Sequence, residues 1–260
     1  MTKENVRCLI GTSGWTYPHW KGVFYPEDVA QSRWFDYYTR QFLTVEINAT
    51  FYRSFGESTY RKWRDRAPPG FKFVLKVPRF ITHRKYLKDL EESINRFWES
   101  AVILEDSLGL VLLQLAPHTP YDPERLRKAL VAFGDPGNVA VEFRHKKWFT
   151  EEIKEMLKET RSVFCISDSP DTPLLAWATS ETAYIRLHGR ARWYDYDYSE
   201  QDFNEIAVFA GKVSRIGART VYIFFNNDSC GYAPHNALSL MKILGTKAWP
   251  ISGSQGLRMG

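Results

Sequence analysis

The feature that most constrains the fold is a strand-like pattern that recurs eight times along 260 residues. In each stretch apolar side chains occupy one parity, and charged or amide side chains stand late on the other parity. Because successive side chains of a strand point to opposite sides, each stretch has an apolar face and a polar end. The predicted strands are Arg7–Thr12, Thr44–Phe51, Lys72–Val77, Leu110–Leu115, Val139–Trp148, Val163–Asp168, Ala183–His188 and Thr220–Phe225.

The segments between these strands are long enough to cross from one parallel strand to the next. Helices are predicted over Trp34–Phe42, Ser58–Arg66, Leu87–Glu105, from Asp122 to about Gly134, from Thr150, from Ser199 to about Arg215, and over Pro234–Leu244. The segment from Ser169 to Glu181 is short and poorly periodic, so the sixth helix is predicted to be reduced or missing. The order predicts one α/β domain over residues 1–260, a (β/α)₈ TIM-like barrel with a frayed tail from about residue 245.

A doubly wound open sheet is the competing arrangement. Its phosphate-binding signature, GxGxxG after the first strand, is absent, because the chain has Gly11-Thr-Ser-Gly14 at that place. No break in composition separates two domains, and a length near 250 residues is typical of a closed barrel. We therefore expect the barrel.

Composition excludes several classes of protein. The formal net charge of +5 favours anionic partners but is too small to indicate nucleic-acid binding by itself. No apolar run approaches the roughly 20 residues of a membrane span, and the N-terminus lacks a secretory core. The cysteines are far apart and form no CxxC pair: Cys8, Cys165 and Cys230. We expect a cytoplasmic protein that does not contact a membrane.

The polar parity locates a candidate site. A layer of helices would cover the apolar parity, so the polar side chains are predicted to face the barrel axis at the C-terminal end, where TIM-barrel active sites lie. These candidates are Glu46, Asn48, Lys76, Gln114, Glu142, Arg144, Asp168, Arg186, His188 and Asn226. A purely structural ion network is the alternative, but so many buried charges are a costly way to fill space.

Basic and aromatic side chains also collect in the loops that follow the strands. Arg79 and His83 follow the third strand, and together with Arg144 and Arg186 they would hold a phosphate or carboxylate. Trp15 and Tyr194 would stack on a base or sugar, although most such rings serve as packing residues. The predicted partner is a small anionic substrate.

Roles follow from side-chain chemistry. Glu46, Glu142 and Asp168 are candidate acid–base groups, and His188 beside Arg186 is a candidate proton shuttle, although a lone histidine is more often structural. The enzyme would be a hydrolase or a lyase. No Ser-His-Asp order, P-loop, HExxH or zinc spacing appears, so no metal site is assigned and no cofactor is required. A magnesium ion held by the carboxylates is a less favoured alternative.

Two further functions stay open. The basic rim with its Trp and Tyr loops also suits a protein that binds or processes nucleic acid. A non-catalytic sensor of a small anion would need only the arginines. An acid–base enzyme is favoured, because neither alternative gives the carboxylates a role.

The sequence resembles the DUF72 or YecE-like family over most of its length. The matching segments are Gly11–Trp15 (GTSGW), Phe24–Pro26 (FYP), Thr44–Tyr52 (TVEINATFY), Lys76–Arg79 (KVPR) with Ile81–His83 (ITH), Leu113–Leu115 (LQL), Val141–His145 (VEFRH), Tyr184–Gly189 (YIRLHG) and Phe225–Asp228 (FNND). One departure is Ala116, where the family usually has a second proline before the position of Pro117. The resemblance implies a TIM-like barrel, related by fold analogy to endonuclease IV-like enzymes. It implies no particular reaction.

Overall fold

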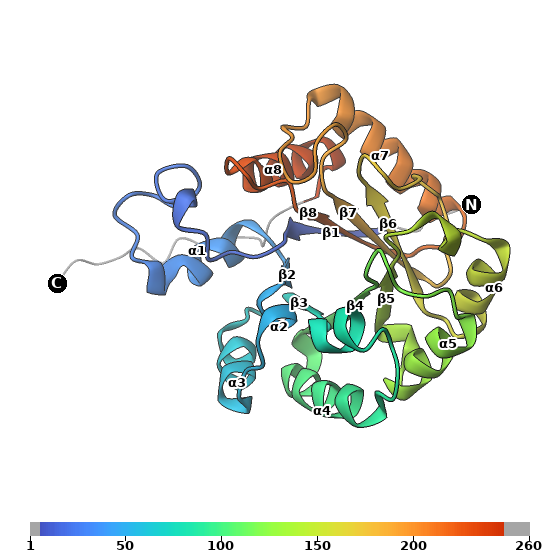
Figure 1. Cartoon of the computed structure of the whole chain (residues 1–260). Helices are drawn as coiled ribbons and strands as arrows, with labels where there is room; N and C mark the ends of the chain where they lie inside the picture. Colours follow the sequence, from blue (N-terminus) through green and yellow to red (C-terminus); the bar gives the residue numbers. More distant parts are fainter. Residues whose placement is uncertain (1–5, 247–260) are drawn as a thin grey trace.

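The computed structural model describes residues 6–246, in which eight parallel strands form one barrel (Figure 1). The strands are β1 (Arg7–Thr12), β2 (Thr44–Ile47), β3 (Lys72–Lys76), β4 (Leu108–Gln114), β5 (Val139–Glu142), β6 (Val163–Asp168), β7 (Thr182–Leu187) and β8 (Thr220–Phe225). They pair in the order β1-β8-β7-β6-β5-β4-β3-β2, and a parallel bridge between Ser13 and Glu46 joins the two ends. The predicted TIM-like fold is confirmed.

Helices surround the barrel on its outside (Figure 1). They are α1 (Trp34–Gln41), α2 (Ala49–Tyr52), α3 (Glu57–Arg66), α4 (Glu91–Ala101), α5 (Pro123–Ala132), α6 (Glu151–Glu159), α7 (Glu200–Arg215) and α8 (Tyr232–Leu244). Several begin where the sequence carries a cap: the side chains of Asp122, Thr150 and Ser199 each accept a hydrogen bond from a backbone amide of the first turn. None of the helices between residues 6 and 246 is both long and apolar enough to cross a membrane.

The connection from β6 to β7 contains no helix in the described chain, as predicted. Trp177 from this connection lies 4.7 Å, centroid to centroid, from the ring of Phe164 on β6. An irregular segment therefore covers part of the outer face of β6 in place of a helix.

Side-chain parity divides the core into two layers, as the sequence predicts. The layer inside the barrel consists of Leu9, Val74, Leu110, Leu112, Ala140, Val163, Cys165, Tyr184, Tyr222 and Phe224. Residues of the opposite parity, such as Val45, Leu75, Val141 and Ile185, belong to the larger core beneath the helices. The inward-facing side chains are apolar toward the N-terminal ends of the strands. The polar inward-facing residues lie above them, toward the C-terminal ends.

Some predicted boundaries were wrong. The second strand ends at Ile47, and the chain turns into α2, because the Thr50 hydroxyl bonds to the backbone carbonyls of Ile47 (3.0 Å) and Lys76 (2.7 Å). Asn48 therefore begins a helical turn instead of continuing the strand. The fifth strand ends at Glu142, and the predicted helix over residues 87–105 is α4 followed by a 3-10 segment. The predicted frayed tail falls largely on residues 247–260, outside the described residues.

Gly11 marks the seam where β1 meets β2. A Cβ at this position would lie 2.2 Å from the carbonyl oxygen of Thr44 and 3.1 Å from the hydroxyl of Tyr38. That hydroxyl already bonds across the seam, to the Thr44 carbonyl at 3.1 Å and to the Thr12 amide at 3.0 Å. Closure of the barrel thus depends on the absence of a side chain here.

We predict that Gly11→Ala lowers the free energy of unfolding by at least about 1–3 kcal/mol, because the methyl group forces the backbone of the seam apart. Gly211→Ala, within α7, is the control: its Cβ would meet only the end of Arg215 at 3.7 Å. This control should raise stability by about 0.5–1 kcal/mol. Urea unfolding monitored by circular dichroism gives both values, and equal stability of wild type and Gly11→Ala would contradict the closure argument.

Candidate functional site

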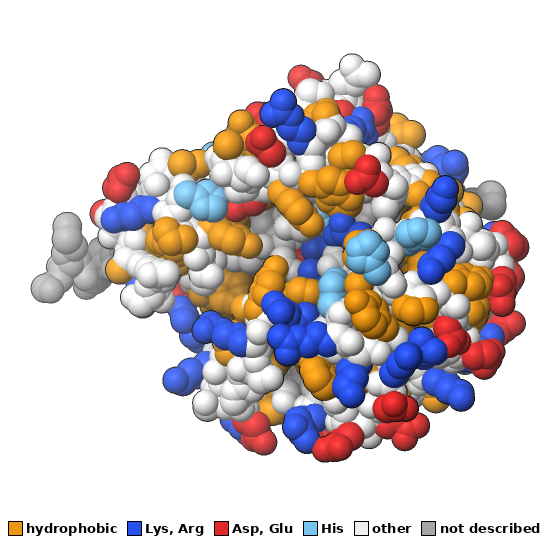
Figure 2. Space-filling view, viewed as in Figure 1, with side chains coloured by type: hydrophobic (Ala, Val, Ile, Leu, Met, Phe, Trp, Pro, Cys, Tyr) orange, Lys and Arg blue, Asp and Glu red, His pale blue; other side chains and the backbone are white. Residues whose placement is uncertain are grey.

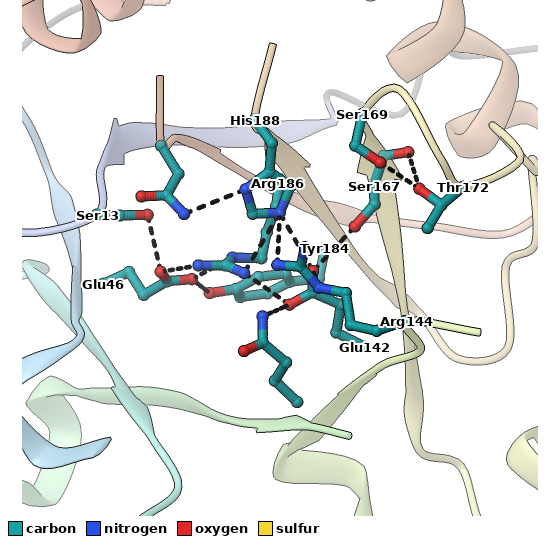
Figure 3. A network of polar contacts seen from close by, with 12 residues as sticks. Ser13, Glu46, Glu142, Arg144, Ser167, Ser169, Thr172, Tyr184, Arg186 and His188 are labelled. Atoms are coloured by element: carbon teal, nitrogen blue, oxygen red, sulfur yellow. Dashed lines mark hydrogen bonds and ion pairs between the residues drawn. The ribbon is translucent and has the colours of Figure 1, made fainter. Parts of the chain in front are cut away.

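A guanidinium shared between two carboxylates lies at the centre of the barrel mouth (Figure 3). Arg186 from β7 binds Glu46 through two hydrogen bonds, Nε to Oε2 at 2.9 Å and Nη2 to Oε1 at 2.7 Å. Its Nη1 donates to Glu142 Oε2 at 2.6 Å. All three side chains are fully buried. We call Glu46, Glu142 and Arg186 the axial cluster.

Glu46 is satisfied by further donors from β7 and from the end of β1. The Tyr184 hydroxyl donates to its Oε2 at 2.5 Å, and the Ser13 hydroxyl donates to its Oε1 at 2.7 Å. Burial alone would raise the pKa of Glu46, but the charge and hydrogen bonds of Arg186 and Tyr184 outweigh burial and lower it. Glu46 is therefore ionised at neutral pH and has no free lone pair directed at the mouth.

Glu142 is held even more strongly. Apart from Arg186, its hydrogen-bond donors are Gln114 Nε2 (2.7 Å), Ser167 Oγ (3.1 Å) and His188 Nε2 (3.1 Å), and Arg144 Nε forms an ion pair with it at 2.8 Å. The N–H of Arg144 Nε is not aligned with this oxygen, so that contact is an ion pair without a hydrogen bond. Burial opposes ionisation, but the two arginines and His188 hold the pKa of Glu142 well below its usual range.

His188 is neutral in this environment. Burial and the nearby Arg186 lower its pKa to about 3. Its Nδ1 lies 3.1 Å from Asn226 Nδ2, and its Nε2 lies 3.1 Å from Glu142 Oε1. The tautomer that satisfies both partners carries its proton on Nε2, donates to Glu142 and accepts from Asn226. His188 therefore fixes the position of Glu142 and stays uncharged at neutral pH, with its single ring proton on Nε2.

Arg144 forms the upper edge of the cluster. Its side chain is 11% exposed, and its guanidinium lies 4.5 Å above the ring of Trp193. Nη2 lies 3.3 Å from His188 Nε2, which already carries a proton in the tautomer assigned above. Because the guanidinium has five N–H groups, Arg144 keeps donors for a ligand in the mouth.

Lys76 is a buried cation of the mouth that has no ion-pair partner among the described residues. Its side chain is buried at the end of β3, yet no carboxylate oxygen in residues 6–246 lies within 4.0 Å of Nζ. The amine lies 4.2 Å above the ring of Phe51. Burial and the charge of Arg186 lower the pKa of Lys76 to about 7, against the opposing effect of Glu142 and Glu46. The free amine is therefore far more accessible near neutral pH than in an exposed lysine.

The mouth has a positive potential. Burial, together with the charges of Lys76, Arg144 and Arg79, lowers the pKa of His83 to about 4. Arg79 is exposed on the loop after β3. In Figure 2 a hollow lies near the centre of the face, with Lys, Arg and His side chains gathered around it. Bringing another cation here is unfavourable, so the site suits an anion.

The structure separates two predicted site residues from this mouth. Asp168 has the outward parity of Ile166, and its carboxylate accepts a hydrogen bond from Arg190 Nε at 3.0 Å. It lines an outer groove of about 790 Å³ between β7 and α7, so the prediction that it faces the axis was wrong. Trp15 is half-buried and packs against Phe35 and Trp63, at centroid distances of 5.3 and 6.2 Å, on the core beneath the helices.

The other predicted residues are placed at or around the mouth. Tyr194 is 43% exposed and lies 5.7 Å, edge to face, from His188. Asn48 begins α2, directly after the strand that carries Glu46, and its buried Oδ1 has no hydrogen-bond partner. This oxygen could accept a hydrogen bond from a bound ligand.

Sequence reasoning missed four residues of the site: Ser13, Ser167, Tyr184 and Trp193. The first three have the inward parity of their strands and could have been found from that signal. Ser167 was not predicted, because the carboxylate of the adjacent Asp168 is a more common acid–base group than a hydroxyl. Trp193 lies in a loop, where side chains do not alternate regularly and the sequence does not indicate which way they point.

The donor set does not fit a metal ion. In the part of the chain that the structure describes, no three His, Cys, Asp or Glu side chains are grouped as metal ligands. Glu46 and Glu142 are saturated by arginine, hydroxyl, amide and imidazole donors, and Asp168 is paired with Arg190. The alternative of a magnesium ion held by these carboxylates therefore lacks free ligands.

We predict that Arg186→Met lowers the free energy of unfolding by about 3–5 kcal/mol, because it leaves two carboxylates buried without their cation. Arg219→Met is the control: Arg219 is 67% exposed at the opposite end of the barrel, 3.6 Å from Glu181, and should change stability by less than about 1 kcal/mol. Chemical denaturation at neutral pH measures both, and equal losses would show that the axial cluster carries no special stability.

The low pKa of His188 predicts a pH-dependent contribution to stability. Between the folded pKa of about 3 and the unfolded value near 6.5, the unfolded chain binds one proton more than the native one. The contribution is complete above pH 6.5 and is lost as the pH falls, with a slope that approaches about 1.4 kcal/mol per pH unit. His188→Gln should remove this slope between pH 6.5 and 5, as measured by urea unfolding. An unchanged slope in the variant would mean that His188 is protonated in the native state.

Comparisons with known proteins place the chain in a family. The family model described as "Protein of unknown function DUF72" matches residues 9–256. The UPF0759 protein YunF of Bacillus subtilis is 25% identical, over 90% of this chain and 94% of that protein. The UPF0759 protein YecE of Escherichia coli K12 is 31% identical, over 56% of this chain and 52% of that protein.

Solved structures agree with the sequence comparison. A DUF72 family protein from Thermotoga maritima is 31% identical and superposes with a TM-score of 0.84, covering 92% of this chain and 99% of that one. A DUF72 family protein from Enterococcus faecalis, at 24% identity and a TM-score of 0.80, shows the same fold. The chain belongs to the DUF72 family, as its sequence motifs predict.

Proposed function

We propose that the protein is an enzyme that binds a small anionic substrate at the barrel mouth and moves a proton with the amine of Lys76. The observation that carries the proposal is this buried amine, which has no carboxylate partner and lies at the end of a strand beside a saturated charge cluster. A general base is most effective when its pKa lies near the working pH, and the pKa of Lys76 is about 7.

The carboxylates receive a different role from the one that the sequence suggests. Glu46 and Glu142 have lowered pKa values and are surrounded by donors, so neither exchanges a proton readily near neutral pH. In the proposal they position Arg186 and Arg144 and set the potential that Lys76 experiences. His188, neutral and engaged at both nitrogens, holds Glu142 in place.

The substrate class follows from charge. With the two carboxylates balanced by Arg186 and Arg144, protonation of Lys76 gives the mouth a net positive charge, to which Arg79 adds at the rim. A phosphate or carboxylate would bind the free N–H groups of Arg144 and approach Lys76. Removal of a proton from carbon, as in a lyase, or from water, as in a hydrolase, fits this arrangement.

Anion binding is expected to depend on Arg144. Arg144→Met should weaken binding of inorganic phosphate, pyruvate or dihydroxyacetone phosphate by about 10- to 100-fold, the equivalent of one lost charge-assisted interaction. Arg219→Met, at the far end of the barrel, is the matched control and should bind like wild type. Isothermal titration calorimetry measures the affinities. If none of the anions binds, or if both variants bind equally well, the mouth is not the anion site.

A screen for turnover separates the enzyme from a sensor. Wild type and Lys76→Met are incubated with a mixture of phosphorylated and carboxylated metabolites, and mass spectrometry follows the loss of each compound. The proposal expects at least one compound to be consumed by wild type and not by the variant. Anions that bind with no turnover in either protein would favour a non-catalytic sensor.

Nucleic-acid binding is a second candidate, favoured by exposed rings near exposed basic residues. Tyr52 is 68% exposed, and Phe80 is 42% exposed next to Arg79. Such rings can stack on unpaired bases. Affinity for a single-stranded oligonucleotide that falls steeply with salt would support this function, and no binding at low salt would remove it.

We also propose a reducing, cytoplasmic setting. Cys8, Cys165 and Cys230 are all free thiols, and Cys165 is buried inside the barrel. Disulfides are the usual reinforcement in oxidising compartments, and these cysteines provide none.

A further inference from the structure

The position of Lys76 suggests more than proton transfer. Nζ has no ion-pair or hydrogen-bond partner in residues 6–246. The atom is not fully buried, so it keeps access to the mouth. Its backbone is fixed, because the Lys76 carbonyl accepts the Thr50 hydroxyl at 2.7 Å. The same turn carries Phe51, whose ring supports the side chain at 4.2 Å from Nζ. The amine is thus held in place without being neutralised.

Charged groups at the ends of β2, β5 and β7 act on this amine, whereas the adjacent β4 ends in the uncharged Gln114. Glu46 on β2 and Glu142 on β5 favour its protonated form, whereas Arg186 on β7 and Arg144 after β5 disfavour it. His83, on the turn after β3, is neutral near pH 7 because its own pKa is lowered to about 4. Burial and the arginines prevail, so a free amine is available at neutral pH. A desolvated lysine beside other cations is the usual arrangement for an amine nucleophile.

We infer that Lys76 is a covalent nucleophile that forms an imine with a small aldehyde or ketone bearing a phosphate or carboxylate. This inference rests on the proposed function and names its substrate class. The Nζ lone pair attacks the carbonyl carbon, the C=O π electrons move to oxygen, and a proton passes from nitrogen to that oxygen. The resulting carbinolamine takes up one proton and loses water to give an iminium ion. No oxidant or reductant takes part.

The surroundings favour this step over simple proton transfer. The iminium ion is positively charged as long as its nitrogen keeps the proton; Glu142 and Glu46 favour a cation at this position, whereas Arg186 and Arg144 oppose it. The anionic substituent of the substrate would bind the free N–H groups of Arg144, whose Nε is already paired with Glu142. The C=N bond then accepts electrons when a proton or a carbon substituent leaves the adjacent carbon. A lyase reaction follows naturally from this chemistry.

Reductive trapping tests the inference. The protein is incubated at pH 7 with pyruvate, dihydroxyacetone phosphate or pyridoxal 5′-phosphate, each followed by sodium borohydride, and is analysed by intact mass and peptide mapping. We expect one equivalent of reduced adduct on Lys76 with at least one probe, and at least a 10-fold loss of that adduct in Lys76→Arg. Peptides that carry surface lysines serve as the internal reference.

A second measurement needs no variant and no substrate. Competitive labelling of wild type with acetic anhydride from pH 5.5 to 9.5 should give half-maximal reactivity of Lys76 near pH 7. Half-maximal reactivity above pH 9 would overturn the inference, because the amine would then be protonated when substrate arrives.

The outcomes distinguish the inference from the function on which it rests. Adduct confined to Lys76 supports the imine. If no probe is trapped at saturating concentration, while anions still bind in an Arg144-dependent manner, the imine is overturned and the acid–base enzyme stands. If adducts are spread evenly over surface lysines and anions do not bind, both proposals fail.

Discussion

The guanidinium of Arg186, shared between Glu46 and Glu142, is the interaction on which the rest of the site depends. Burying three charges is expensive unless each finds partners in good geometry. Here strands far apart in the sequence, β2, β5 and β7, must bring their ends to one point, and only a closed barrel does so. Hydroxyl and amide groups from Ser13, Gln114, Ser167 and Tyr184 then complete the network. The closed barrel is therefore required to form the axial cluster, and the cluster in turn stabilises the closed arrangement of these strands.

The same cluster is the reason that the proposed reactive group is a lysine and not a carboxylate. Each carboxylate is so well solvated by fixed donors that its proton affinity falls, which makes it a poor acid or base. The arginines that achieve this also repel a further cation. Lys76, without a carboxylate in contact, experiences that repulsion together with burial, and its proton affinity falls toward neutrality. The ion network around Arg186 thus lowers the proton affinity of Lys76 as well as holding the strand ends together.

Sequence parity predicted the barrel and most of the axial cluster, because strand periodicity and burial are local properties that alternate with every residue. It placed Glu46, Glu142, Arg186 and His188 together correctly. It failed at Asp168, which belongs to the outward parity. It also failed at Asn48, because the tertiary hydrogen bonds of Thr50 convert the expected strand end into α2. The proton affinities could not be predicted, because they depend on distances between strands that are far apart in the chain: Arg186 lies 140 residues from Glu46 and 44 from Glu142.

The seam of the barrel connects closure with the charge cluster. β1 and β2 join through the backbone bridge between Ser13 and Glu46, and the side chains of the same two residues share a hydrogen bond of 2.7 Å. Glu46 is in turn fixed by Arg186 from the opposite side of the barrel. Opening the seam would expose this carboxylate to water and remove the field that lowers the proton affinity of Lys76. The low proton affinity on which the proposed role of Lys76 depends therefore requires a closed seam, which couples closure of the barrel to the electrostatics of the site.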